Sequence, residues 1–253
     1  MSGIPAEIAK LFDRYDRQAR LYPAVIAFSP IIYSTILLFP DVVSSVSHAA
    51  ATALISMCVL FMLANLSRAQ GKRVEVRLLD KWDGWPTTAL LRYRDERIDR
   101  NTKARYHTAL KALAKDLIFP SREDEVEDPK SADDVYRSAT KKLIEARRGD
   151  KYGRILDENI SYGFRRNLLG LKVIAVITLS VAILLTMLGC WIEIDWPPTL
   201  GGIAKAVKHY PHLPVLLGVD IIFLGIWLVA VNDDFVSQAA VSYAEALFRS
   251  LEK

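Results

Sequence analysis

The chain has 253 residues, of which 51% are hydrophobic and 25% are charged, and its formal net charge is +4. With 12 glycines, 11 prolines and two cysteines, it is not a collagen, an intrinsically disordered chain or a disulfide scaffold. Four segments contain no Lys, Arg or Glu: residues 21–40, 42–67, 173–192 and 209–232. About 20 apolar residues cross the hydrocarbon core of a bilayer, so each segment is long enough to span it. We therefore expect a membrane protein rather than a wholly soluble one.

Residues 1–20 precede the first apolar segment and are amphipathic. Apolar residues recur in them at helical spacing, with four cations in the other positions; the apolar residues are Ile4, Ile8, Leu11 and Tyr15. The pattern predicts a helix that either lies at the membrane interface or extends the first span into the cytoplasm. The next two apolar segments have no cation between them, so we expect a transmembrane hairpin over residues 21–67.

The distribution of cations predicts the orientation. Four Lys and Arg residues precede the first span, 25 lie in residues 67–172, two lie in residues 193–212 and two follow the fourth span. Cation-rich loops stay on the cytoplasmic side, so both termini and the central segment are predicted to be cytoplasmic. Residues 173–231 then form a second hairpin with an outer loop over residues 193–212. The expected location is the inner cell membrane.

Residues 68–172 predict a helical cytoplasmic domain. One helix is expected from a cap at Asn101 or Thr102 to a stop before Pro120, and another from a capping box at Ser131 and Asp134. Residues 123–128 predict an acidic turn between them. Residues 74–79 fit either a strand or a continuation of the second span, and we favour the helix because a single short strand would have no partner. A chain break is predicted at residues 82–86.

Residues 232–253 predict an amphipathic cytoplasmic helix. Its apolar stripe is Val236, Ala240, Tyr243, Leu247 and Leu251. The stripe forms either a short coiled-coil seam or a face that packs on the chain's own cytoplasmic domain. The expected fold class is thus an all-α membrane protein, with two transmembrane helical hairpins flanking a helical cytoplasmic domain.

No catalytic signature is present in the sequence. It contains no phosphate-binding glycine loop, nucleophile elbow, dinucleotide fingerprint or Cys/His cluster with metal spacing. His209 and His212 are three residues apart but have no third ligand nearby. We expect neither an enzyme nor a cofactor. The segment 67–172 has a net charge of +7, which adjacent anionic lipid explains, so nucleic acid is not an expected partner.

The first candidate site combines two tryptophans with a cation-rich segment. Trp82 and Trp85 flank the predicted break, and Arg92 and Arg94 follow it. Stacking on Trp and bidentate contacts from Arg would suit an anionic small-molecule ligand. The alternative is structural: the tryptophans anchor the core, and the arginines pair with Asp95, Glu96 and Asp99.

The second candidate site lies just before the third span. Asn159, Tyr162, Arg165 and Arg166 suit a lipid headgroup or a phosphorylated ligand at the membrane surface, or a coupling of domain movement to the span. The alternative is that these arginines only anchor the topology.

The third candidate is Asp220, the only Asp, Glu, Lys or Arg within the four apolar segments. A carboxylate at this depth faces a helix-bundle interior or water, which suits an ion pathway. The alternative is a structural Asp held by Tyr33, Ser34 or Thr186. Gly218 and Gly225 on the same helix form a small-residue face that suits close packing or self-association.

Two hydrophobic pairs around a helical insert, without an enzyme motif, resemble the four-span effectors proposed as pore formers in bacterial antiphage systems. Residues 82–88 and 159–167 also resemble stretches of bacterial membrane proteins of that group. The resemblance implies an oligomeric pore-forming or membrane-disrupting effector, gated by a cytoplasmic protein or an anionic small molecule. Four spans enclose no wide aqueous path, so conduction requires a homo-oligomer. The alternative function is a non-conducting membrane scaffold or signalling subunit that recruits a cytoplasmic partner.

Overall fold

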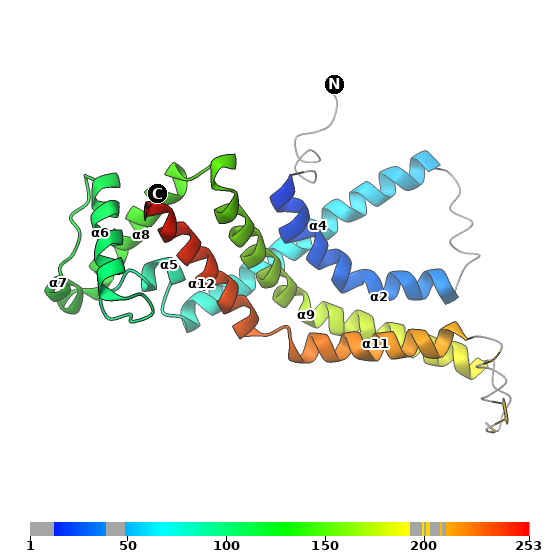
Figure 1. Ribbon diagram of the computed structural model, residues 1–253. Coiled ribbons are helices and arrows are strands. Elements are labelled where there is room, and N and C mark those ends of the chain that lie inside the picture. Colours follow the sequence, from blue (N-terminus) through cyan, green and yellow to red (C-terminus); the bar gives the residue numbers. More distant parts are fainter. Residues whose placement is uncertain are drawn as a thin grey trace. The chain divides into compact units, whose positions relative to one another are not determined.

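The computed structural model describes residues 13–38, 49–192, 199, 201–202, 208 and 211–252, and its regular structure in these ranges is entirely helical (Figure 1). The chain divides into two compact units. Unit 1 comprises Met1–Val74 and Phe164–Phe235, and unit 2 comprises Glu75–Gly163 and Val236–Lys253. Most of the predicted outer loop, and residues 1–12 of the predicted N-terminal helix, lie outside the described residues.

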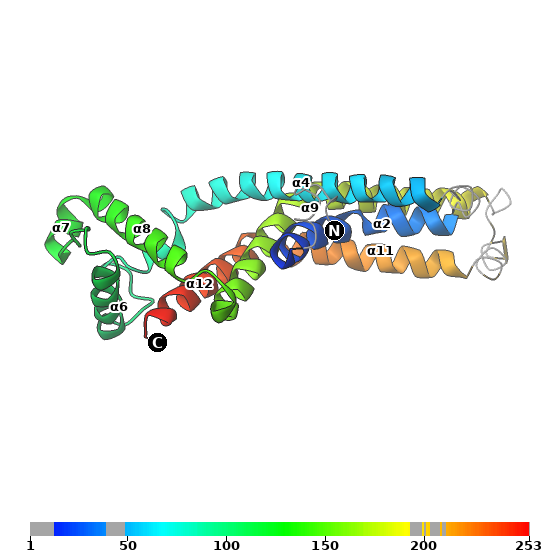
Figure 2. The same cartoon turned by 90° about the horizontal axis from the view of Figure 1, so that it is seen from above.

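Unit 1 contains the apolar helices. They are η2 (Asp16–Leu21) with α2 (Tyr22–Leu38), the first part of α4 (Ala49–Lys81), most of α9 (Gly153–Ile192), and α11 (His212–Val229). The π-helical turn η2 leads directly into α2, so this stretch extends the first apolar helix at its N-terminal end. Figure 2 shows α2, α4 and α11 running lengthwise in this unit.

Two helices of the described chain are long and apolar enough to cross a membrane, Asp16–Ile36 and Gly153–Leu188. A third crossing is counted if Leu213–Val229 and Asp233–Glu252, which are bent by 63° at a short break, form one span. The predicted second span falls on α4, but residues 42–48 lie outside the described part. The protein is therefore all-helical in its described part, with two or three helices that fit a bilayer.

Helices α4 and α9 approach each other closely at two glycines. A Cβ atom on Gly170 would lie 2.6 Å from the carbonyl carbon of Gln70, and one on Gly71 would lie 1.7 Å from Asn167 Oδ1. Any larger residue would force the helices or the Asn167 side chain to move, so this close approach depends on glycine.

The C-terminal end of α4 confirms two expectations for residues 74–86. The chain stays helical to Lys81 rather than forming a strand. The helix then ends in a turn in which Asp83 has φ 55° and Gly84 has φ 108°, both in the left-handed region. Gly84 N donates to Leu79 O at 2.8 Å, which closes the last turn of α4.

Unit 2 is formed by shorter helices. They are α5 (Pro86–Ala89), α6 (Arg100–Leu113), α7 (Arg122–Glu127), α8 (Pro129–Ala146), η3 (Asp150–Tyr152), most of α12 (Asp233–Arg249) and η4 (Ser250–Glu252). The cap expected for α6 was wrong by two or three residues, because Asp99 accepts a hydrogen bond from Thr102 N at 3.0 Å. Asn101 lies within the first turn.

The start of α8 and the acidic stretch before it also differ from expectation. Asp128 caps α8 through Ser131 N at 3.1 Å, and Pro129 occupies the first helical position, so Ser131 is not the cap. The acidic stretch is a helix, α7, rather than a turn. A capping box between Ser121 and Asp124 starts it, and its acidic first turn complements the helix dipole.

The core of unit 2 joins residues that are far apart in sequence. Its buried side chains are Leu90, Leu91, Tyr106, Leu110, Ala114, Phe119, Ala132, Tyr136, Ala139, Leu143, Ala244, Leu247 and Phe248. Helix α12 supplies the last three, and all three are fully buried. Of the predicted apolar stripe, Leu247 lies in this core and Leu251 packs against it, so this part of the tail packs on the chain's own helical unit, the second of the two alternatives.

Candidate functional site

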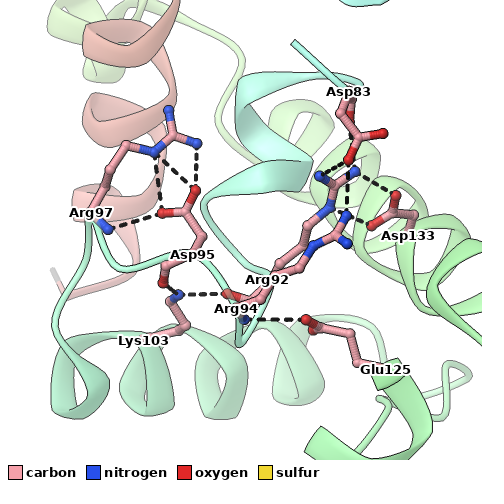
Figure 3. A network of polar contacts seen from close by, with 8 residues as sticks. All are labelled: Asp83, Arg92, Arg94, Asp95, Arg97, Lys103, Glu125 and Asp133. Atoms are coloured by element: carbon pink, nitrogen blue, oxygen red, sulfur yellow. Dashed lines mark hydrogen bonds and ion pairs between the residues drawn. The ribbon is translucent and has the colours of Figure 1, made fainter. Parts of the chain in front are cut away.

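Arg92 lies at the centre of a polar network in unit 2 (Figure 3). It follows α5, and only 6% of its surface is exposed. Its Nε and Nη2 donate to the two carboxylate oxygens of Asp133 at 2.8 and 2.6 Å, and its Nη1 donates to Asp83 Oδ2 at 2.7 Å. The hydrogen-bonded ion pair with Asp133 raises the pKa of Arg92. This bidentate geometry fixes the guanidinium between the end of α4 and helix α8.

The other residues of the first candidate site surround the same turn. Arg94 Nη2 donates to Asp83 Oδ2 at 2.9 Å, so both arginines share one carboxylate. Trp82 is half-buried, and Trp85 is 37% exposed at the start of α5. The structure thus brings Arg92 and Arg94 together, and their carboxylate partners are Asp83 and Asp133. The structural alternative had named other partners, Asp95, Glu96 and Asp99.

Glu125 of α7 is a buried carboxylate that positions the segment after Arg92. It accepts hydrogen bonds from Tyr93 N at 2.9 Å, from Arg94 N at 3.3 Å and from the Tyr136 hydroxyl at 2.8 Å. Burial and the Glu125 hydrogen bond raise the pKa of Tyr136. The sequence did not indicate Glu125, because its partners are contributed by other parts of the chain.

Lys103 closes the other side of this segment. Its ammonium donates to the backbone carbonyls of Arg92, at 2.6 Å, and of Asp95, although it is 4% exposed. Burial lowers the pKa of Lys103. The Asp95 side chain in turn accepts from Arg97 Nη2 at 2.5 Å. Figure 3 shows these groups converging on the segment from α6 and α7. They tie the chain between α5 and α6 to both α6 and α7.

A cavity of about 700 Å³ adjoins the network. Tyr93, Lys103 and His107 line it, together with cations and carboxylates at its rim: Asp95, Glu96, Asp99, Arg100, Lys111 and Arg122. Its volume is that of a small-molecule site. The rim is mixed in charge, so it selects neither a cation nor an anion strongly.

His107 is, with Lys103, a buried titratable group of this cavity. Its Nε2 donates to Leu91 O at 2.8 Å, because a carbonyl only accepts, and its Nδ1 lies 3.3 Å from the Tyr93 hydroxyl. Burial lowers the pKa of His107, with Lys103 and Lys111 acting in the same direction. The ring is therefore neutral at pH 7, and Nδ1 accepts the Tyr93 hydrogen.

The residues of the second candidate site lie along α9. Tyr162 is buried in unit 2, and its hydroxyl lies 3.2 Å from Glu75 Oε1, while Asn159 is half-buried one turn earlier. In unit 1, Arg165 donates to Phe235 O at 3.1 Å and stacks on the Phe235 ring at 4.6 Å. The polar groups of Tyr162 and Arg165 therefore contact other residues of the protein.

Asn167 belongs to this stretch but was not proposed as a site residue. It is fully buried, and its Nδ2 donates to Ala19 O at 2.6 Å. Its Oδ1 accepts from Arg166 Nε and Nη2 at 3.3 Å, and Arg166 is only 5% exposed. Asn167 also fills the space that the absent side chain of Gly71 leaves. An Asn beside an apolar helix, opposite a glycine, was the signal that could have identified it.

Asp220 is fully buried within unit 1. Its Oδ1 accepts a hydrogen bond from the Tyr33 hydroxyl of α2, one of the three partners expected for a structural Asp. Its Oδ2 has no hydrogen-bond partner in the described part of the chain. Ser34 and Thr186 are also fully buried, and the Thr186 hydroxyl donates to Ala182 O of its own helix at 2.9 Å. Gly218 and Gly225 have no atom within 4 Å of an added Cβ.

Within the described residues, no group of three or more His, Cys, Asp or Glu residues is arranged to hold a metal ion. No family model, no curated protein and no solved structure matches the chain.

Proposed function

We propose that the chain is the subunit of an oligomeric membrane protein in which unit 2 controls the membrane helices. In this proposal the chain crosses the inner membrane four times, with both termini and unit 2 in the cytoplasm. The oligomer forms a pore or disrupts the bilayer when unit 2 changes conformation. Antiphage defence is the biological setting that we propose.

The observation that carries the proposal is the continuity of α9. This single helix of 40 residues begins among the polar helices of unit 2 and continues as an apolar segment of unit 1. Helix α4 likewise belongs to both units. A continuous helix transmits rotation or translation along its axis, because its backbone hydrogen bonds resist local bending.

Two contacts of α9 connect its movement to particular helices of unit 1. Where α9 enters unit 1, Asn167 is bound to Ala19 O, and Gly170 lies against the backbone of α4. A movement of α9 therefore changes the packing of α4 and of the N-terminal helix together. Packed helices move between discrete arrangements rather than deforming continuously, which suits a gate.

Ion flux in reconstituted vesicles tests the proposal. The purified chain is inserted into vesicles of phosphatidylethanolamine and phosphatidylglycerol, and potassium efflux is followed with a potential-sensitive dye. We expect efflux that rises more steeply than protein density, because several subunits form one conducting unit. Asp220→Asn should change the flux or its selectivity by replacing the buried carboxyl group with an amide that cannot ionise. Ser180→Ala is the matched control, since Ser180 is exposed on α9 and donates to Val176 O of its own helix.

Flux that is absent from wild-type vesicles, with normal insertion and oligomer size, contradicts conduction by the chain alone. Expression in cells with and without the neighbouring genes, read with the same dye, then tests whether a partner is needed. No depolarisation in either strain rejects the pore.

A non-conducting scaffold or signalling subunit is the second candidate. It is favoured by the burial of Asp220 within its own chain and by the Tyr33 hydrogen bond, which are typical of a structural polar contact between membrane helices. Unchanged flux in Asp220→Asn, together with impaired assembly in Asp220→Leu, supports this candidate.

A further inference from the structure

Unit 2 contains a second cavity, of about 590 Å³, whose lining is strongly cationic. It lies where the end of α8, the start of α9 and the end of α12 meet. Its polar lining consists of Arg147, Lys151, Tyr152, Arg154, Arg249 and Ser250. The described side chains that line it thus include four cations and no carboxylate. The 700 Å³ cavity, by contrast, has three carboxylates in its lining.

Arg147 is held in place by contacts within unit 2. Its Nε donates to Ser250 Oγ at 3.2 Å, and its Nη2 donates to Ser250 O at 3.4 Å. Its guanidinium also stacks on the Tyr152 ring at 5.1 Å. An arginine has five N–H donors, so three remain available after these two bonds. Because its orientation is fixed before binding, little side-chain entropy is lost when an anion arrives.

The other three cations are available at the rim. Lys151 and Arg154 are exposed, and neither forms an ion pair with any residue that the structure describes. Arg249 pairs with Glu245 at 3.1 Å across one turn of α12. That pair is exposed, and such pairs contribute little, so an anion can draw Arg249 away at low cost.

We propose that this cavity binds a phosphate-bearing anion, with Arg147, Lys151 and Arg154 contacting the phosphate oxygens. The ligand is either a soluble phosphorylated molecule or the headgroup of an anionic lipid, since both present the same chemistry. This proposal does not depend on the proposed function, because binding is measured without ion flux.

Two titrations of the full chain in neutral detergent test the site and separate the sources. Inorganic pyrophosphate is the soluble probe, and detergent micelles doped with phosphatidic acid are the lipid probe; both are read by intrinsic tryptophan fluorescence and by thermal shift. The test variant is Lys151→Gln with Arg154→Gln, whose side chains are exposed and do not support the core. The matched control is Arg137→Gln with Arg148→Gln, which removes two exposed cations of the same unit outside the cavity.

We expect wild type to bind at least one probe, with an affinity that falls as salt is added. The cavity variant should weaken binding by about tenfold or more, and the control by about twofold at most, because only the cavity variant loses two charge-assisted contacts to the anion. Binding of pyrophosphate identifies a soluble ligand, and binding of phosphatidic acid alone identifies a headgroup. No binding of either probe by wild type overturns the proposal, as does equal weakening in the two double variants.

Discussion

Arg92 and Arg94 lie two residues apart and share Asp83, yet their environments differ. The Arg92 side chain is 7% exposed and the Arg94 side chain is 56% exposed. A buried charge that loses its partner stays desolvated, whereas an exposed charge returns to water at little cost. The guanidinium of Arg92 therefore contributes to the stability of unit 2, whereas the guanidinium of Arg94 contributes little.

Replacing Arg92 should destabilise unit 2. In Arg92→Gln the Asp133 carboxylate, 19% exposed, keeps its charge but loses two hydrogen bonds. We expect a loss of about 2 kcal/mol in the free energy of unfolding, against about 0.5 kcal/mol or less for the control Arg94→Gln. Thermal unfolding of the full chain in detergent measures the difference, and hydrogen exchange locates it in residues 83–99 and 129–140. Similar melting of both variants would show that Asp133 does not need Arg92.

At the scale of helices, the contact between α4 and α9 makes a sharp prediction. The Cβ atom of Gly170→Ala would lie 2.6 Å from a backbone atom of Gln70, so the helices must separate. Overpacking of this kind costs about 1–3 kcal/mol. Gly225→Ala is the control, since a Cβ there meets nothing within 4 Å.

The two glycine variants are compared by the midpoint of thermal unfolding in detergent. Gly170→Ala should unfold at a lower temperature than wild type, and Gly225→Ala should not. If both behave like wild type, the close approach of α4 to α9 is absent from the protein in detergent.

Sequence periodicity predicted most helices because their patterns are local. The continuation of α4 to Lys81 and the amphipathic α12 both follow from the spacing of apolar residues. Helix starts were less certain, because several capping residues compete within three positions. Asp128 displaced Ser131 at α8, where Pro129 fits the first helical position. The acidic stretch formed α7 because Ser121 and Asp124 provide a capping box.

The candidate sites depended on long-range pairing and were harder to predict. Asp220 was found because a lone carboxylate among apolar residues needs a partner, and Tyr33 was one of few groups able to supply it. The partner of Arg92, Asp133, lies 41 residues away. Many carboxylates in the chain could have paired with Arg92 equally well, so only the packing of α8 selects Asp133.

At the scale of the whole molecule, orientation is the property that the charge distribution predicts. In a chain with Cys58 and Cys190 replaced by Ala, Asp116→Cys in unit 2 should not react with an impermeant thiol reagent added outside intact cells. Thr199→Cys should react, since it lies in the predicted outer loop. Labelling of intact and lysed cells measures both. Reaction at residue 116 but not at residue 199 would reverse the orientation.

The core of unit 2 includes Ala244, Leu247 and Phe248, which follow both α9 and α11 along the chain. A ribosome therefore makes the last part of this core only after it has translated both α9 and α11. Until then, the Tyr106 ring lacks the Phe248 ring that packs beside it. Unit 2 thus reaches its final packing after the apolar helices have been translated. A chain stalled or cleaved before residue 236 leaves this surface exposed to chaperones and proteases.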